Sequence, residues 1–146
     1  MKKKILLIGI NARWTHSNPA LYYLRTYVND LDYDIQICEY TINQTFMEIM
    51  SDIYLKKPDV IAFSVYIWNT KTVQNLLKDL KKILPNCKII LGGPEVSYHP
   101  QKWFDKFNID HIICGSGESG FRELLLHNFD FKLKVIRKTN PPFSEI

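Results

Sequence analysis

The chain has 146 residues, of which 46% are hydrophobic and 23% are charged. This length is typical of a single domain, and this composition excludes a disordered chain, a collagen-like fibre and a disulfide-rich toxin. The net charge of +4 arises at the two ends, since residues 5–131 carry 12 basic and 14 acidic side chains, so no surface suited to nucleic acid is expected.

Compartment and thiol state follow from two further features. No apolar stretch approaches the roughly 20 residues that cross a bilayer. No signal-peptide cleavage site follows the first apolar stretch, residues 5–10. Cys38, Cys87 and Cys114 lack the paired spacing of zinc or iron–sulfur sites and lie in apolar stretches. We therefore expect a cytoplasmic protein, not associated with a membrane, whose cysteines are buried and reduced.

Short apolar stretches alternate with amphipathic segments along the whole chain. Strands are predicted at 4–10, 33–40, 60–65, 88–91 and 109–114, and a candidate edge strand at 133–136. Helices are predicted at 18–29, 44–55, 70–84, 101–107 and 118–128. This order predicts a three-layer α/β/α domain with a five-stranded, mainly parallel sheet and a possible sixth strand at its edge.

The C-terminal residues have a different composition from the rest. Pro141 and Pro142 favour an extended segment. We expect residues 1–138 to form one domain and residues 139–146 to begin a linker to a further domain.

The loops that follow the predicted strands hold the candidate binding residues, because parallel α/β sheets bind ligands at the carboxyl ends of their strands. These loops combine small, hydroxyl and large aromatic residues, which suits a broad, flat ligand. The candidates are Asn11, Arg13, Trp14, Thr15, His16, Ser64, Tyr66, Trp68, Gly92, Gly93, Pro94, Glu95, Gly115, Gly117 and Glu118. For Glu95, contact with a ligand and capping of a turn are equal alternatives.

One glycine pattern allows a second interpretation. Gly115, Gly117 and Gly120 form a GxGxxG pattern, but it follows the last long predicted strand rather than the first, and no acidic residue stands about 20 positions on. A tight turn into a helix and a nucleotide site both remain open.

Four stretches, in order along the chain, resemble the B12-binding N-terminal domain of radical SAM proteins. Ser64-Val-Tyr66 and Gly92-Gly93 are similar to the Ser-x-Leu and Gly-Gly pair of cobalamin-binding domains. The longer similar stretches are residues 11–17, 58–69, 91–97 and 110–118.

The resemblance implies a flavodoxin-like (Rossmann-like) sheet that holds cobalamin across its carboxyl edge. The dimethylbenzimidazole tail would lie between the sheet and a flanking helix, lined by Ser64 and Tyr66, with room provided by Gly92 and Gly93. The first loop would lie under the corrin ring. His16 is the candidate lower ligand of cobalt, although Trp14 stands where related domains carry the aspartate that orients such a histidine.

Beyond this chain, the resemblance implies a covalently attached radical SAM domain that holds a [4Fe–4S] cluster and S-adenosylmethionine. The CxxxCxxC motif for that cluster is absent here, so we assign this chain no catalytic residues. Relatives catalyse methyl transfer or cyclisation, and many carry the label anaerobic Mg-protoporphyrin IX monomethyl ester cyclase. Two alternatives stay open: a flavodoxin-like module that binds FMN or a nucleotide, and a ligand-free interaction domain.

Overall fold

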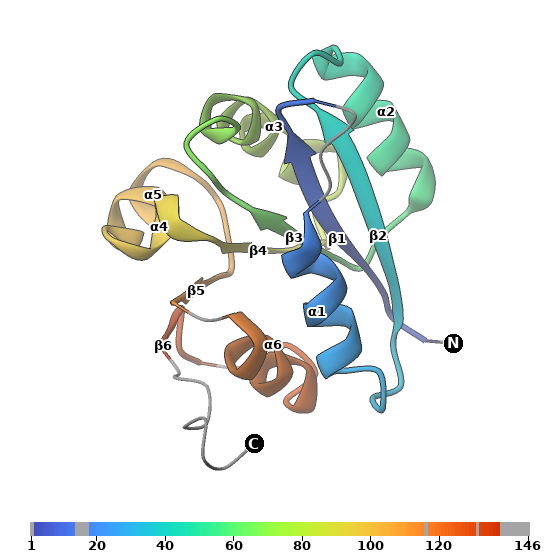
Figure 1. Cartoon of the computed structure of the whole chain (residues 1–146), viewed down its shortest axis with the longest axis vertical. Coiled ribbons are helices and arrows are strands. Elements are labelled where there is room, and N and C mark those ends of the chain that lie inside the picture. The colour runs from blue at the N-terminus through green and yellow to red at the C-terminus, as the bar shows by residue number, and fades with distance from the viewer. Residues whose placement is uncertain (1, 14–17, 116, 131, 138–146) are drawn as a thin grey trace.

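A parallel β-sheet runs through the centre of the molecule (Figure 1). The computed structural model describes residues 2–13, 18–115, 117–130 and 132–137. Within these residues six strands form one sheet in the order β2-β1-β3-β4-β5-β6, and every neighbouring pair is parallel. The strands are β1 (Lys4–Asn11), β2 (Asp34–Thr41), β3 (Val60–Ser64), β4 (Lys88–Gly92), β5 (His111–Cys114) and β6 (Val135–Arg137). The predicted flavodoxin-like fold is confirmed, and the candidate edge strand is present as β6.

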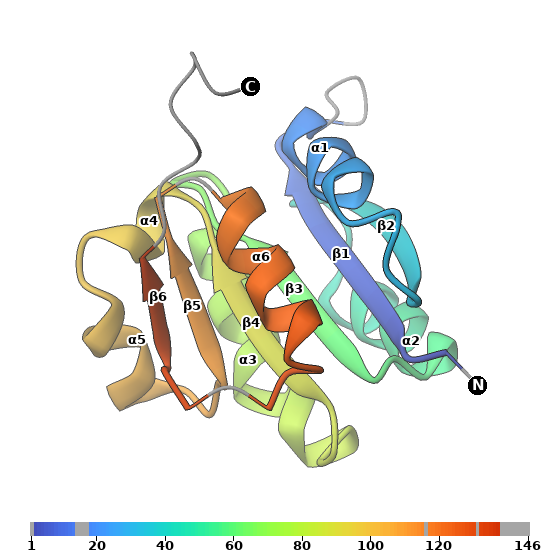
Figure 2. The same cartoon turned by 90° about the horizontal axis from the view of Figure 1, so that it is seen from below.

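Helices cover both faces of the sheet (Figure 2). One face carries α1 (Pro19–Tyr27) and α6 (Gly117–Leu126). The other carries α2 (Phe46–Lys56), α3 (Thr70–Ile83), α4 (Pro94–Ser97) and α5 (Pro100–Lys106). Consecutive residues of β1 face opposite layers: Ile5 and Leu7 pack beneath α1 and α6, whereas Leu6 and Ile8 pack beneath α2 and α3. A strand buried on both faces has no polar side, which explains its continuously apolar sequence.

Helix starts follow the sequence closely. The side chain of Asn18, the first residue of the predicted helix 18–29, accepts a hydrogen bond from the amide of Ala20, and Pro19 occupies the first turn of α1. Helix α2 begins at Phe46, because the Thr45 hydroxyl caps it by accepting from the amide of Glu48 at 3.2 Å. The four-residue helix α4 was not predicted.

Two large apolar side chains of the helical pattern remain exposed. Phe46 is 39% exposed and Ile83 is 40% exposed. Both line a shallow hollow between α2 and α3. Phe46 lies at the start of its helix and Ile83 at the end of its own, so helical spacing alone did not predict their exposure.

The cysteines are free and buried, as expected. Burial raises the pKa of Cys87 to about 12, so its sulfur stays a thiol at neutral pH. Within the described ranges, no helix combines the length and apolar content needed to cross a bilayer.

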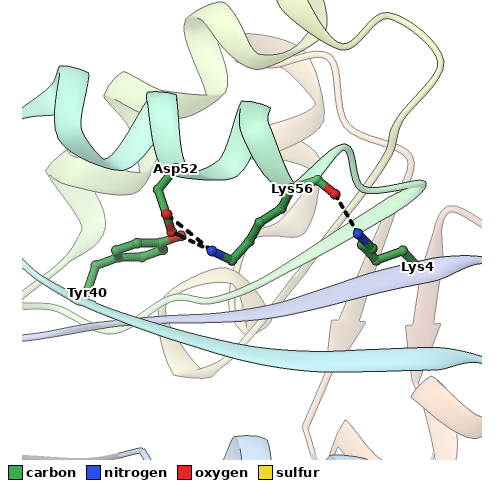
Figure 3. Close-up of polar contacts among 4 residues, drawn as sticks. All are labelled: Lys4, Tyr40, Asp52 and Lys56. Carbon is green, nitrogen blue, oxygen red and sulfur yellow. Dashed lines mark hydrogen bonds and ion pairs between the residues drawn. The ribbon is translucent and has the colours of Figure 1, made fainter.

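A polar network ties α2 to the first two strands (Figure 3). The Tyr40 hydroxyl donates to Asp52, and Lys56 Nζ lies 3.1 and 3.0 Å from the two oxygens of the same carboxylate. Lys4 Nζ donates to the Lys56 carbonyl at 2.8 Å, near the C-terminal end of α2. The hydrogen bond from Tyr40, with help from Lys56, holds the pKa of Asp52 below its ordinary value of 3.8.

The depressed pKa of Asp52 predicts an acid-dependent loss of stability. Its contribution is fully present above pH 3.8, the ordinary value, and is lost as the pH falls through the lower pKa of the folded state. Because the Asp52 side chain is 45% exposed, we expect at most about 1 kcal/mol. Urea unfolding measured at several pH values below about 5 tests this. In Tyr40→Phe the free energy of unfolding should decrease less steeply as the pH falls, whereas Tyr54→Phe, on the exposed side of α2, should keep the slope of the unmodified chain. Equal slopes for the two variants would contradict this assignment.

Candidate functional site

The smallest residues of the sheet meet at its carboxyl edge. Gly9 of β1 pairs with Ser64 of β3, which pairs with Gly92 of β4. Gly9 lies two positions beyond Leu7 and Gly92 two beyond Ile90, so they share the face covered by α1 and α6, and Ser64 is in register with both. The neighbours β1 and β3 also flank the point where the strand order reverses, since β1 lies between β2 and β3. Little side-chain volume therefore stands where parallel α/β sheets bind ligands.

The glycines at this edge have different surroundings. A methyl group on Gly9 would lie 2.9 Å from Leu21 Cδ1, so α1 already fills that space. A methyl group on Gly92 would find its nearest non-neighbouring atom, the Ile113 carbonyl oxygen, at 3.9 Å. Gly92 therefore opens onto free space.

That space is a cleft of about 440 Å³ with α1 on one side and α6 on the other. Leu7, Ala62 and Ile90 form its floor, and Leu24 and Phe121 contribute apolar walls. In Figure 2, β3 is visible between these two helices. Eight predicted site residues line the cleft: Ser64, Tyr66, Gly92, Gly93, Pro94, Gly115, Gly117 and Glu118.

A stacked aromatic pair stands beside the mouth of the cleft. The rings of Tyr66 and Trp68 lie 4.5 Å apart and are inclined by 3°. Tyr66 lines the cleft, whereas Trp68 does not, and Trp68 Nε1 donates to the Ile10 carbonyl at 3.2 Å. Trp68 therefore packs against the Tyr66 ring and is itself held by β1.

A buried amide holds the ends of the two central strands together. Asn69 Nδ2 donates to the carbonyls of Ile10 and Ser64, both at 3.0 Å, and Asn69 Oδ1 accepts from the Tyr66 amide at 2.8 Å. Asn69 is only 1% exposed. It ends the 58–69 stretch and directly precedes α3, but the sequence did not predict its structural role.

Gly93 is fixed by the backbone around it. Its φ of 102° and ψ of 171° lie in a region that only glycine occupies readily, and a methyl group there would lie 2.5 Å from the Val65 carbonyl oxygen. Ser97, also missed from sequence, donates to the Gly93 carbonyl at 2.9 Å and accepts from the Gly115 amide at 3.2 Å. It therefore joins the turns that follow β4 and β5.

Glu95 lies away from the cleft. Its exposed side chain lines a separate hollow between α3 and α5, with Gln74 and Lys102. Its backbone amide donates to the Val65 carbonyl at 3.3 Å, so Glu95 contributes to the turn through its backbone.

Glu39 of β2, which the sequence analysis did not identify, connects the two ends of the first loop. Its Oε1 accepts from Asn11 Nδ2 at 3.3 Å and from the Asn18 amide at 2.8 Å, and Tyr22 donates to Oε2 at 3.3 Å. Asn11 is therefore buried at the base of the loop, whereas Arg13 is exposed.

Three predicted loop residues, Trp14, Thr15 and His16, lie outside the described residues. Elsewhere, in the part of the chain that the structure describes, no group of three or more His, Cys, Asp or Glu side chains is placed to hold a metal ion.

The GxGxxG glycines serve the turn and the packing of α6. Gly115 has a φ of 76°, and Gly117 lies against Leu24 of α1. A methyl group on Gly120 would lie 2.8 Å from Ile113 Cγ2 and 3.2 Å from Ile136 Cγ2. This geometry matches the tight-turn interpretation.

The helices beside the cleft are joined to each other away from its mouth. Arg122 of α6 forms two hydrogen bonds with Asp30, at 2.7 and 2.8 Å, and donates to the Tyr27 carbonyl at 3.0 Å. The Arg122 guanidinium lowers the pKa of Asp30 to about 2. Tyr33 also donates to the Leu125 carbonyl of α6 at 2.6 Å.

Comparison with known proteins gives a consistent picture. A family model described as B12 binding domain matches residues 5–125. A cobalamin-dependent radical SAM methyltransferase of Streptomyces tokunonensis is 40% identical over 70 residues, which is 47% of this chain and 10% of that protein. A hopanoid C-3 methylase of Methylococcus capsulatus is 28% identical over 96 residues, 64% of this chain and 18% of that protein.

The structural comparison concerns the fold alone. The cobalamin-dependent S-adenosylmethionine radical enzyme OxsB, with aqua-cobalamin and S-adenosylmethionine bound, has a TM-score of 0.78 at 16% identity, covering 95% of this chain and 23% of that one. The chain thus matches between a tenth and a quarter of the length of these relatives. Their names include a methyltransferase and a methylase, and they give the expected cyclase label no support.

Substitution by alanine should affect the free energy of unfolding strongly at Gly93 and only weakly at Gly92. Gly93→Ala should lower the free energy of unfolding by about 1–3 kcal/mol or more, because its conformation excludes a side chain and the methyl group meets backbone. Gly92→Ala should change it by less than about 1 kcal/mol, because the methyl group enters free space. Urea unfolding of the two variants measures the difference, and equal losses would contradict the cleft geometry.

Proposed function

We propose that this chain, a cobalamin-binding domain that belongs to the B12 binding domain family, holds the nucleotide tail of cobalamin in the cleft between α1 and α6. The observation that carries the proposal is the open floor at Gly92, beside Ser64, at the carboxyl edge of the central strands. The family match supports cobalamin as the cofactor, and the geometry of the cleft supports this location for its tail.

The cleft suits the tail in size and chemistry. Its volume of about 440 Å³ is within the usual range of about 300–1,000 Å³ for small-molecule sites. Its floor and walls are apolar, which suits a dimethylbenzimidazole base, and Ser64 places a hydroxyl at the carboxyl end of the floor.

The residues around the mouth would contact the corrin. Tyr66, held against Trp68, offers an aromatic ring at the mouth. Gly115 and Gly117 allow close approach of the backbone. The first loop, whose base is fixed by Glu39, would bring Trp14, Thr15 and His16 beneath the ring, with His16 as the candidate cobalt ligand.

Catalysis would belong to the whole protein. Bound cobalamin supplies a cobalt centre suited to group transfer, and this chain's residues bind and orient it. We propose that a covalently attached radical SAM domain, reached through residues 139–146, provides the [4Fe–4S] cluster and S-adenosylmethionine. The names of the relatives support methyl transfer rather than cyclisation as the reaction.

An absorbance titration with hydroxocobalamin tests the tail site. The unmodified chain should show saturable binding. Gly92→Leu should weaken it at least about tenfold, because the new side chain occupies the cleft and tenfold corresponds to only about 1.4 kcal/mol. Asn75→Leu, on the exposed side of α3, is the matched control and should bind normally. Unchanged affinity in a folded Gly92→Leu variant would overturn the proposed site.

The same titration with His16→Ala decides the role of that histidine. If His16 ligates cobalt, the bound spectrum of the unmodified chain should show imidazole ligation, and the variant should lose it. Identical bound spectra would exclude ligation and leave His16 as a loop residue.

A further inference from the structure

We infer that the cleft selects the base of the cofactor's tail, and that it accepts a benzimidazole base but disfavours a purine base such as adenine. The inference rests on the proposed function, because it concerns the same cleft. It goes further by assigning the chain a preference among natural corrinoids, which share the corrin ring and differ in this base.

Among the described residues that line the inner part of the cleft, none has a polar side chain that could form a hydrogen bond with a base. Its floor consists of Leu7, Ala62 and Ile90, and its walls include Leu24 and Phe121. These side chains end in carbon atoms and pack against the apolar layer beneath α1 and α6.

Backbone groups of the floor are also occupied. Strand β3 lies between β1 and β4, with Ala62 paired to Leu7 on one side and to Ile90 on the other. Its amide and carbonyl groups therefore bond within the sheet. A base lying on this floor meets carbon surface and already paired backbone.

Within the described part of the chain, polar side chains line the cleft only at its mouth, at or beyond the carboxyl ends of β3, β4 and β5: Ser64, Tyr66, Ser97, Tyr98 and Glu118. Ser64 stands at the carboxyl end of the floor, one pleat beyond Ala62. The Ser97 hydroxyl already donates to the Gly93 carbonyl and accepts from the Gly115 amide. The cleft thus offers its polar contacts at one end and apolar surface along the rest.

The two classes of base make different demands on such a surface. A benzimidazole has one ring nitrogen free for a hydrogen bond, and the rest of its edge is carbon. A purine carries further ring nitrogens, and adenine also has an exocyclic amine. Each polar group buried without a partner loses its hydrogen bonds to water, and one such group corresponds to about a tenfold loss of affinity.

The experiment compares three corrinoids by absorbance or calorimetric titration of the same chain. These are cobalamin, its adenine-containing analogue and cobinamide, which lacks the base. We expect cobalamin to bind at least tenfold more tightly than the adenine analogue, and cobinamide to bind more weakly than cobalamin. Equal affinities for cobalamin and the adenine analogue, both above cobinamide, would overturn the selectivity and leave the tail site standing. Equal affinities for all three, or no binding, would overturn the tail site itself.

A pair of variants tests the cause. Ala62→Ser adds a hydroxyl to the floor, whereas Ala62→Cys adds a group of similar size with little polarity. The serine variant should narrow the ratio between cobalamin and the adenine analogue, and the cysteine variant should keep it. An unchanged ratio in the serine variant would contradict the apolar floor as the source of selectivity.

Discussion

The carboxyl edge of the sheet depends on one buried amide. Asn69 bonds to the carbonyls of Ile10 and Ser64 and to the amide of Tyr66, and it does so without access to solvent. Buried backbone groups at strand ends need such partners, because an unpaired one costs about 1–3 kcal/mol. Since these bonds join β1 to β3 and fix the segment after β3, they also set where Tyr66 and Trp68 stand.

Several residues at the mouth hold the fold, whether or not they also line the cleft. Asn69, Gly93, Ser97 and Trp68 direct their polar groups or backbone at other parts of the chain. Gly92 opens onto free space. Adjacent positions in the Gly92-Gly93 pair therefore differ in kind, and only the first probes ligand binding without disturbing the fold.

The sequence predicted the strands, the helices and their layers well, because the apolar patterns that indicate them lie within short segments of the chain. A strand such as Lys4–Asn11, apolar on both faces, can only be a central parallel strand, and the rule that ligands bind at strand ends then led to Ser64, Tyr66 and Gly92. The structural roles of Asn69, Ser97 and Glu39 could not be predicted this way. Each of them has a backbone partner in a segment distant in sequence, and these contacts become visible only once the strands are placed side by side.

The width of the cleft follows from the apolar layer more than from the charges around it. The Arg122–Asp30 pair joins α6 to the turn after α1, but the Asp30 side chain is 58% exposed, so solvent and salt screen the attraction. Leu21 and Phe121 are each 1% exposed, and burial of such a side chain contributes about 1.5–3 kcal/mol. These two side chains pack α1 and α6 onto the sheet, so the spacing that leaves Ala62 of β3 lining the cleft is set by the core. A tail that enters this cleft would meet a surface already shaped by the fold, which favours affinity because little ordering is required on binding.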